Sequence, residues 1–556
     1  MKKLIAIILA LVTVLSLCAA CGGGATGEGG GEQAGNSNGS GEKIKLTIGL
    51  PTNANVLSFD DNALTRWLEA ETGYELEFIP YAGGTDIATQ IATTVAAEQP
   101  LPDLLLGISL GDDVITRYGK DGYFLDLAPY YEDREGASKV FWTRFEETFS
   151  EAEQENILRL MTVPETGAIY CVPTLETSLV DIMDYQMWIN VEWLDKLGLE
   201  KPTNTDELYE VLKAFKTQDP NGNGQADELP LYGYGGAEHM LGADVVNWLV
   251  NQFLYFNDRR SFSVDENGEL SPMFTKDEYR EALKFINKLI DEGLMLDSVF
   301  NTKQSEMPMI TTPASGTALC GIFAGHLTLH AAVDNELLYQ YEPLKNWGTC
   351  VYNDNTNRRQ NFITADCKNP EAAFNLMMTM WTADGSYRIR YGEYGVNWAD
   401  ADEGAVSDLG LPATYKILRD PLMEQNTCLW STGVMCTLVV YSEGETAQLT
   451  TEQSEWAKYK SALHAESRKL FDEVAALNNP PAEQICPSLV YTEEEKEETE
   501  AERTACADYY KKSRTDFCVG KLDPNSDADW QEYLDTLADL GLETWLELAQ
   551  IAFDRT

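Results

Sequence analysis

The chain has 556 residues, of which 41 are basic and 90 acidic, so its formal net charge is −49. Its length suits two or three domains with full cores, and its hydrophobic content of 44% is that of an ordinary globular protein. A surface this acidic repels nucleic-acid phosphates and anionic lipid. The charge therefore argues against nucleic acid as a partner and favours a neutral or cationic small ligand.

The first 20 residues have the pattern of a secretory signal peptide. Two lysines precede the apolar run LIAIILALVTVLSL, and small residues stand immediately before Cys21. This end is similar to the lipobox of bacterial lipoproteins, in which the cysteine carries the lipid, although Cys18 stands where that pattern usually has leucine. No other run approaches the roughly 20 apolar residues that span a bilayer. We therefore expect export, and anchoring at the extracellular face of the cell membrane through lipid on Cys21 alone.

Cysteine usage predicts free thiols. The chain has 11 cysteines, and removing Cys18 and Cys21 leaves nine (11 − 2). An odd number scattered over a long chain indicates mostly buried thiols and no disulfide framework. One or two disulfide bridges remain an alternative, because sequence alone cannot show which cysteines would pair.

The N-terminal part of the chain alternates strand and helix patterns. Residues 21–43 are rich in Gly, Ser and Asn, which predicts a flexible tether. The predicted strands that follow cover 43–50, 74–81 and 103–108, and the predicted helices between them cover 63–73 and 86–99. This βαβ rhythm predicts a mostly parallel sheet with helices on both faces.

Longer helices are predicted further along the chain. The segment 202–216 has Thr203 as its expected N-cap and an apolar stripe at helical spacing. The members of that stripe are Leu208, Val211, Leu212 and Phe215. The segment 369–381 has Asn369 as its expected cap, and the chain beyond about residue 450 is predicted to be mostly helical. The acidic run 492–502 is predicted to be a solvated face or a loop, not part of a site.

The motif GISLG at 107–111 fits the G-x-S-x-G pattern and follows a buried strand, as a nucleophile elbow does. Ser109 would then be the nucleophile of a secreted hydrolase. Asp112 and Asp113 follow directly, and their charge would oppose an oxyanion. The favoured interpretation is a tight strand-to-helix turn.

The motif HLTLH places His326 and His330 four residues apart, so that on a helix they could share a face. A zincin helix needs H-E-x-x-H, and Leu327 stands in place of the glutamate. A buried or hydrogen-bonding role is therefore expected for these histidines.

The stretch DPNGNGQADE at 219–228 is the strongest local signal. Oxygen-bearing side chains alternate around Gly224, at the spacing of the first half of a calcium loop. The expected ligands are Asp219, Asn221, Asn223, Gln225 through its backbone carbonyl, Asp227 and Glu228. Pro230 stands where an EF-hand has its bidentate glutamate, so the loop departs from that pattern, and Glu228 is expected to supply the missing carboxylate. The alternative is a polar Asx-Gly turn without a metal.

Four longer stretches together resemble the extracellular solute-binding lipoproteins of ABC transporters, and in particular their sugar-binding subgroup. They are GAIYCVPTLET (167–177), the segment 187–231 that includes the loop above, CKNPEAAFNLMMTMW with GEYGVNW (392–398), and the C-terminal WQEYLDTLADLGLETWLELAQIAFD. Together with the signal and the tether, the resemblance covers nearly the whole chain. In related alginate-binding proteins a loop like 219–228 holds structural calcium.

The resemblance implies an α/β fold of the type II periplasmic-binding-protein kind, with two lobes of mixed sheets and helices and a helix-rich C-terminus. It implies a signal peptide over 1–20, the lipidated cysteine and tether over 21–43, and two lobes. Lobe 1 is expected to comprise 44–168 with 358–415, and lobe 2 to comprise 169–357 with 416–556. Such lobes close over a ligand by hinge motion.

The resulting hypothesis is a receptor, not an enzyme, that captures an oligosaccharide between the lobes and delivers it to the permease of an ABC importer. We expect it to act as a monomer. The alternatives are a peptide or other polar solute, and the hydrolase that would use Ser109. Aromatic faces and polar side chains recognise sugars, so the candidate ligand contacts were taken from loops beside these motifs. They are Trp398, Tyr394, Phe323, His326, Asp112, Asp113 and Trp430.

Overall fold

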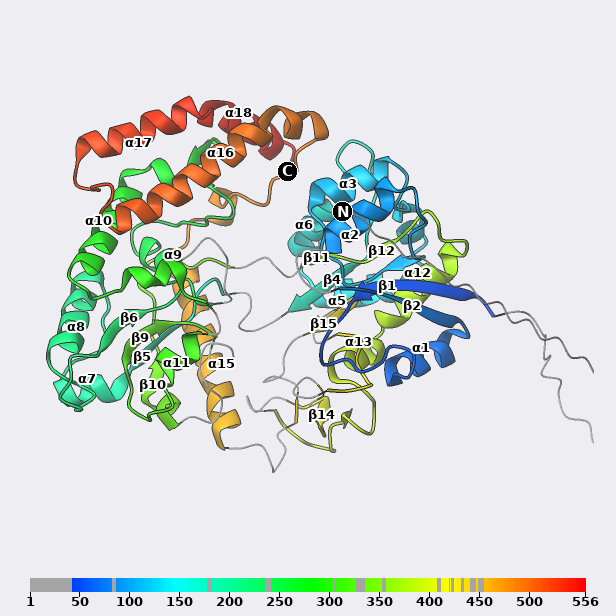
Figure 1. Cartoon of the computed structure of the whole chain (residues 1–556), viewed down its shortest axis with the longest axis horizontal. Coiled ribbons are helices and arrows are strands. Elements are labelled where there is room, and N and C mark those ends of the chain that lie inside the picture. The colour runs from blue at the N-terminus through cyan, green and yellow to red at the C-terminus, as the bar shows by residue number, and fades with distance from the viewer. Residues whose placement is uncertain are drawn as a thin grey trace, which may run out of the picture. The chain divides into compact units, whose positions relative to one another are not determined.

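Two four-stranded sheets organise the chain, and each is the centre of one lobe (Figure 1). The computed structural model describes residues 43–556 apart from 83–86, 178–182, 236–241, 304–305, 327–335, 353–356, 408–411, 420, 422–424, 432–434, 441–446 and 449–454. Cys21, the tether and His330 lie outside the described residues. None of the helices in the described part is both long enough and apolar enough to cross a membrane.

The sheet of lobe 1 confirms the predicted βαβ rhythm. Its order is β12-β3-β1-β2, in which β1 pairs in parallel with β2 and β3, while β12 is antiparallel to β3. The strands are β1 (Lys45–Pro51), β2 (Glu75–Tyr81), β3 (Leu104–Leu105) and β12 (Phe362–Ile363). Alternate side chains of β1 are fully buried, with Ile48 on the face that packs against the helices α1 and α12. Leu105 and Phe362 face the opposite cluster.

Helices cover both faces of the lobe 1 sheet. They are α1 (Ala63–Thr72), α2 (Ile87–Ala96), α3 (Asp112–Lys120), α4 (Ala128–Glu132), α5 (Lys139–Thr148), α6 (Glu151–Met161), α12 (Pro370–Met380) and α13 (Ala383–Tyr391). The chain turns from β3 into α3 at Gly107, whose φ is 67°. The left-handed region suits glycine, so GISLG forms the predicted strand-to-helix turn.

The sheet of lobe 2 has the order β10-β5-β9-β6. Its strands are β5 (Met187–Asn190), β6 (Leu229–Tyr232), β9 (Cys320–Ala324) and β10 (Tyr341–Pro343). β6 is parallel to β9, whereas β5 is antiparallel to both β9 and β10. The helices of this lobe are α7 (Val191–Leu197), α8 (Thr205–Thr217), α9 (Val245–Val250), α10 (Asp277–Asp291), α11 (Met307–Thr311), α15 (Glu455–Asn478), α16 (Glu493–Cys518), α17 (Asp527–Asp539) and α18 (Leu542–Phe553).

Three smaller sheets complete the described strands. They are β11 (Asn357–Arg359) with β4 (Pro173–Thr177) and β15 (Leu438–Val440), β13 (Trp398–Asp400) with β14 (Tyr415–Ile417), and β7 (Phe262–Val264) with β8 (Leu270–Pro272). β4 and β15 pair in parallel, Leu175 opposite Leu438, and both leucines lie in the core of lobe 1.

Because of this pairing, the observed lobe boundaries differ from the expected ones. Val172 and Leu175 pack in the core of lobe 1, although the expected boundary assigned residues from 169 onward to lobe 2. Trp430 and Leu438 also lie in that core, although residues from 416 onward had been assigned to lobe 2. The chain enters the core of lobe 2 at Met183 and again in α15.

One of the two expected helix caps is replaced by its neighbour, and the other, Asn369, holds the N-cap position of α12. Asn204, not Thr203, caps α8, because its side-chain oxygen accepts the backbone N–H of Glu207 at 2.9 Å. Thr203 instead donates its hydroxyl to the Glu207 carboxylate at 2.8 Å. Asn369 makes no capping hydrogen bond, and α12 begins at Pro370. The apolar stripe of α8 is buried as predicted.

The four C-terminal helices confirm the helical prediction beyond residue 450. α16 and α18 lie side by side, and α16 also packs on α10 (Figure 1). The rings of Phe274 and Tyr510 stack there with their centroids 4.3 Å apart. The hydrophobic core of lobe 2 therefore extends through these helices.

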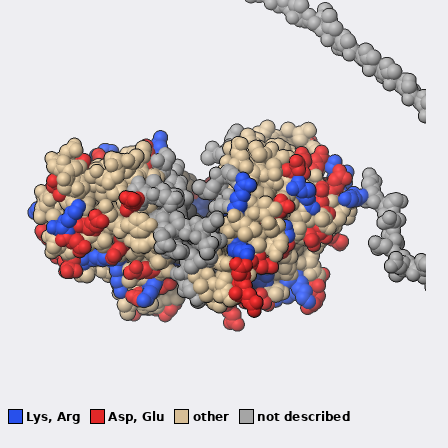
Figure 2. Space-filling view, turned by 90° about the horizontal axis from the view of Figure 1, so that it is seen from below, with Lys and Arg blue, Asp and Glu red and all other residues tan. Residues whose placement is uncertain are grey.

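The thiols and the surface charge agree with the composition. All nine described cysteines are free, and all but Cys428 are buried. Acidic and basic side chains of the described residues are interspersed on the face shown in Figure 2. That face does not carry the continuous basic field that a nucleic-acid partner requires.

Candidate functional site

A pocket of about 520 Å³ is lined by residues of both lobes. Lobe 1 contributes residues 112–113, 115–116, 160–165, 170–171 and Arg359, and lobe 2 contributes residues 259–262, 487–491, Glu493, Lys496, Arg503 and Trp545. Its volume falls within the range of roughly 300–1,000 Å³ that is usual for small-molecule sites. Charged side chains and aromatic rings share its walls.

The lobe 1 wall is built at the start of α3 and the end of β11. Asp112 and Asp113 open α3, where carboxylates are stabilised by the positive end of the helix dipole. Arg359 pairs with the Asp112 carboxylate, and it also donates from Nη1 to the backbone carbonyl of Leu160 at 2.8 Å. These bonds hold the guanidinium group across the pocket wall.

The lobe 2 wall joins the segment before β7 to the segment before α16. An isolated bridge between Ser263 and Ile485 aligns the two segments. Arg260 donates from Nη1 to the hydroxyl of Ser488. The guanidinium carbon of Arg503 lies 5.6 Å from the centre of the Tyr491 ring, which is a cation–π distance. This wall therefore presents arginines beside aromatic rings.

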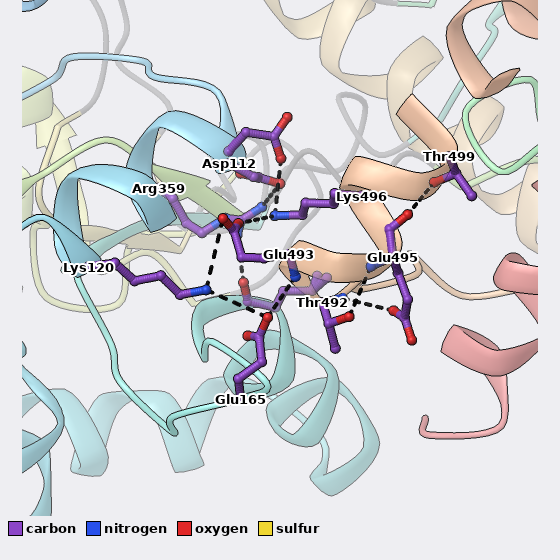
Figure 3. A network of polar contacts seen from close by, with 11 residues as sticks. Asp112, Lys120, Glu165, Arg359, Thr492, Glu493, Glu495, Lys496 and Thr499 are labelled. Atoms are coloured by element: carbon purple, nitrogen blue, oxygen red, sulfur yellow. Dashed lines mark hydrogen bonds and ion pairs between the residues drawn. The ribbon is translucent and has the colours of Figure 1, made fainter. Parts of the chain in front are cut away.

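A network of polar bonds, several of whose members line the pocket, joins the lobes (Figure 3). The Lys496 ammonium lies 3.1 Å from Asp113, and Lys120 lies 3.7 Å from Glu165 and 4.0 Å from Glu493. The backbone N–H of Glu493 donates to the Glu165 carboxylate at 2.7 Å. A carboxylate of lobe 1 thus satisfies one of the free N–H groups at the start of α16 in lobe 2.

Burial raises the pKa of Glu165, but other influences outweigh it. The hydrogen bond from Glu493, a bond from its own backbone, and the charges of Lys120 and Lys496 each favour the ionised form. The pKa of Glu165 therefore lies below its ordinary value, and the carboxylate stays charged at neutral pH.

The acidic run 492–502 was predicted to be a solvated face or loop, and for its first turn that prediction is wrong. Thr492 caps α16, and its hydroxyl and the Glu495 side chain form a capping box. Glu493 and Lys496 reach lobe 1 from this turn. The pattern of charges in the sequence did not distinguish an interface from a solvated face.

Among the expected ligand contacts, Asp112 and Asp113 lie in the pocket. Tyr394 and Trp398 lie elsewhere, in a cluster with Tyr415. Trp398 is buried and donates its indole N–H to the carbonyl of Gly392 at 2.9 Å. Tyr394 is 43% exposed, and its hydroxyl donates to Asp400 at 2.9 Å.

The other three expected contacts are enclosed by protein and do not line the pocket. Phe323 is 0% exposed on β9. Trp430 is 1% exposed, packs in the core of lobe 1 and donates to the hydroxyl of Thr65 at 2.8 Å. His326 is buried against His464, with ring centroids 5.1 Å apart. These side chains stabilise the fold and present no free face to a solute.

Sequence reasoning missed the arginines of the pocket. Arg260 and Arg359 stand in loops or at strand ends without a motif, and Arg503 lies in the middle of a charged helix. The segment 487–491 also carries no signal in the sequence. Folding brings them together from three parts of the chain that lie far apart in the sequence.

Ser109 is exposed, and its hydroxyl lies 3.5 Å from the side-chain oxygen of Gln360. The described histidines are His326 and His464, and both lie in lobe 2. Within the described residues, no histidine is therefore placed to activate Ser109 as a nucleophile.

The loop 219–228 connects α8 to β6 and folds around its own carboxylates. Asp219 accepts the backbone N–H groups of Asn223 and Gly224 at 3.1 and 3.0 Å. Asp227 accepts the side-chain amides of Asn221 and Asn223 at 3.0 to 3.1 Å. In the described part of the chain, no three His, Cys, Asp or Glu side chains gather closely enough to hold a metal. A cation here would need amide and backbone oxygens as well.

Glu228 is the member of the loop whose surroundings favour an additional positive charge. Its Oε1 atom is buried and accepts no hydrogen bond. Burial, followed by the charges of Asp227 and Asp219, raises the pKa of Glu228, although a bond from its own backbone acts in the opposite direction. The donor set thus fits a hard cation, which would relieve this repulsion.

Comparison with known proteins shows which proteins part of the chain resembles. Residues 52–307 match the family model of bacterial extracellular solute-binding proteins. The chain is 30% identical over 268 residues to the fructooligosaccharide ABC transporter substrate-binding protein FusA of Streptococcus pneumoniae. It is 31% identical over 258 residues to the lipoprotein LipO of Bacillus subtilis. Each match covers 46% of this chain and 46% of the relative, so the chain spans about half the length of these curated relatives.

Solved structures share the fold over 92% of this chain. A human-milk-oligosaccharide-binding solute-binding protein of Bifidobacterium longum infantis has a TM-score of 0.71 at 20% identity, with 99% of that chain covered. An EF-hand mutant of FusA with fructo-nystose has a TM-score of 0.67 at 20% identity and 99% coverage. The alginate-binding protein AlgQ2 without calcium ion has a TM-score of 0.61 at 20% identity and 98% coverage.

The two-lobed α/β fold agrees with the match over residues 52–307. The chain is thus similar to bacterial extracellular solute-binding proteins over residues 52–307, a little under half of its length.

Proposed function

We propose that this protein is the solute receptor of an ABC importer and that it captures an oligosaccharide in the pocket between its lobes. The observation that carries the proposal is the pocket itself, since residues of both lobes line it. A solute held by both walls favours the closed arrangement of the lobes, and closure is what a permease can recognise.

The lining has the chemistry that sugars need. Carboxylates and guanidinium groups, including Asp112 and Arg359, can bond ring hydroxyls, and the rings of Tyr170 and Tyr491 offer flat apolar surfaces. The names of FusA and of the Bifidobacterium protein, which specify oligosaccharides, support a sugar over a peptide.

A thermal-unfolding assay against a ligand panel tests the proposal. A ligand that binds only the folded state at 100 times its Kd stabilises it by about 2.7 kcal/mol. We expect fructo-oligosaccharides, milk oligosaccharides or uronate oligosaccharides to raise the Tm of the protein, and a peptide library to leave it unchanged. A shift with peptides and none with any oligosaccharide would contradict the sugar proposal.

We also propose that lipid on Cys21 anchors the protein to the extracellular face of the membrane. The name of LipO, a lipoprotein, supports this. Fractionation of cells tests it, because Cys21→Ser should move the protein from the membrane to the medium. Retention of the variant in the membrane fraction would rule out this anchor.

We further propose that the loop 219–228 binds a structural Ca²⁺. The ligands would be Asp219, Asn221, Asn223, the carbonyl of Gln225, Asp227 and Glu228. The unsatisfied oxygen of Glu228 supports the proposal, as does the description of a FusA structure as an EF-hand mutant. The ion would hold the loop in one conformation.

A further inference from the structure

We infer that the pocket selects an acidic oligosaccharide and that arginines at its lobe 2 end bind a sugar carboxylate. This inference rests on the proposed function, because it names the class of sugar that the same pocket takes. It differs from the expectation based on the net charge of the chain, which by itself favours a neutral or cationic ligand.

Cationic side chains are concentrated in the pocket. Among the lining residues, five are cationic and four are anionic, whereas the whole chain has 41 basic and 90 acidic residues. The cationic ones are Arg259, Arg260, Arg359, Lys496 and Arg503, and the anionic ones are Asp112, Asp113, Glu165 and Glu493. Of the five, Arg259 is paired with Asp184 at 2.7 Å. The lining thus holds one cationic residue more than anionic ones, whereas acidic residues dominate the whole chain.

The four carboxylates are already neutralised by protein groups. Asp112 pairs with Arg359, and Asp113 pairs with Lys496. Glu165 and Glu493 share Lys120. All of these contacts belong to the network that joins the lobes (Figure 3).

The lobe 2 wall of the pocket presents the guanidinium groups of Arg260 and Arg503. Arg503 forms no ion pair with any carboxylate in the described part of the chain, and its guanidinium group instead lies near the Tyr491 ring. Arg260 lines the same wall and donates to the hydroxyl of Ser488. A planar guanidinium group binds a carboxylate through two parallel hydrogen bonds, which a neutral hydroxyl cannot match.

A third arginine faces Arg260 from the other lobe. Arg159 ends α6 beside the lining residues 160–165, and its Nη1 atom is buried without a hydrogen-bond partner. Burial and then the charge of Arg260 lower the pKa of Arg159. Two like charges therefore approach each other between the lobes. An anionic group between them would replace this repulsion with attraction and would bond both lobes at once.

Isothermal titration of the full-length protein tests the inference. The probes are a galacturonate oligosaccharide, a neutral galactose oligosaccharide of the same length and linkage, and a sulfated form of the neutral one. We expect the galacturonate oligosaccharide to bind at least tenfold more tightly than the neutral one. Arg503→Gln and Arg260→Gln should each raise the Kd of the galacturonate oligosaccharide at least tenfold and change that of the neutral one less than twofold.

The neutral sugar reports whether a variant is folded, because its Kd depends on the rest of the pocket. Arg66→Gln is the matched control, since Arg66 is exposed and pairs with Asp61 away from the pocket. It should leave all three affinities unchanged.

The outcomes separate the inference from the proposed function. Equal affinity for galacturonate and neutral oligosaccharides, unaffected by Arg503→Gln, would overturn the inference and leave the sugar-receptor proposal standing. Tighter binding of the sulfated sugar would overturn the carboxylate assignment. No binding of any of the three, together with no response in the wider glycan panel, would overturn the proposed function itself.

Discussion

Asp244 shows how burial changes the charge of a single side chain. It caps α9 by accepting the backbone N–H of Asn247 at 2.7 Å. The cluster around it in lobe 2 also includes Asp184 and Asp258, paired with Arg259 at 2.7 Å and Arg514 at 3.8 Å. Burial raises the pKa of Asp244 to about 7, and the neighbouring aspartates add to the rise while Arg514 opposes it.

The raised pKa of Asp244 predicts a pH dependence of stability. The folded state holds the proton up to about pH 7, whereas the unfolded chain releases it near pH 4. The stability from this group is therefore fully present below pH 4 and is lost as the pH rises through 7. Asp244→Asn keeps the cap and resembles the protonated form. In melting curves from pH 4 to 8, we expect the stability of the wild-type protein to fall by on the order of a few kcal/mol. The stability of the variant should not show this fall. Parallel curves for the two proteins would contradict this.

At the scale of elements, the loop between α8 and β6 is a local feature that a short sequence specifies. Gly222 and Gly224 have φ values of 73° and 74°, and the alternating Asp and Asn side chains bond the turn from within. Its geometry was therefore readable from DPNGNGQADE. Whether an ion binds depends on how closely the oxygens approach one another.

Removal of calcium tests the loop. If Ca²⁺ binds there, a chelator should lower the Tm of the wild-type protein, and added Ca²⁺ should restore it, because the ion binds only the folded state. Asp219→Ala should abolish this response. Asp265→Ala, in the turn between β7 and β8, is a matched control that should keep it. A wild-type Tm that ignores the chelator would rule out the metal.

At the scale of the whole molecule, the start of α16 links two hydrophobic cores that share no residue in the described part of the chain. Its bonds join Glu493 and Lys496 of lobe 2 to Glu165 and Asp113 of lobe 1. Partly exposed ion pairs each contribute about 0.2–1 kcal/mol. Such bonds can hold the lobes together and still allow them to separate.

A double-mutant cycle measures this coupling. Lys496→Gln and Asp113→Asn are combined, and the free energy of unfolding is compared with that of the single variants. We expect a coupling of about 0.2–1 kcal/mol at low salt that vanishes in 1 M salt, where charges are screened. Additive effects at low salt would show that the pair does not join the lobes. Lys139→Gln with Glu135→Gln, an exposed pair within lobe 1, is the matched comparison.

The sequence by itself determined the features that depend on near neighbours in the chain. The period of two in β1, the stripe of α8, the strand-to-helix turn at GISLG and the free thiols were all predicted, because side-chain periodicity and glycine conformation act over a few residues. The motifs between 167 and 231 lie within the residues that match the family model of bacterial extracellular solute-binding proteins, because they preserve such local patterns.

The tertiary structure alone decided which residues line the pocket. It placed Phe323 and Trp430 in the cores although they stand beside family motifs, and it brought Arg159, Arg260 and Arg503 near one pocket. Pairing between residues hundreds of positions apart depends on the path of the chain between the lobes, which no local pattern records. The distribution of charge over the molecule also depends on the tertiary structure. The total of −49 comes from the sequence, but only folding collected the positive charges around one pocket.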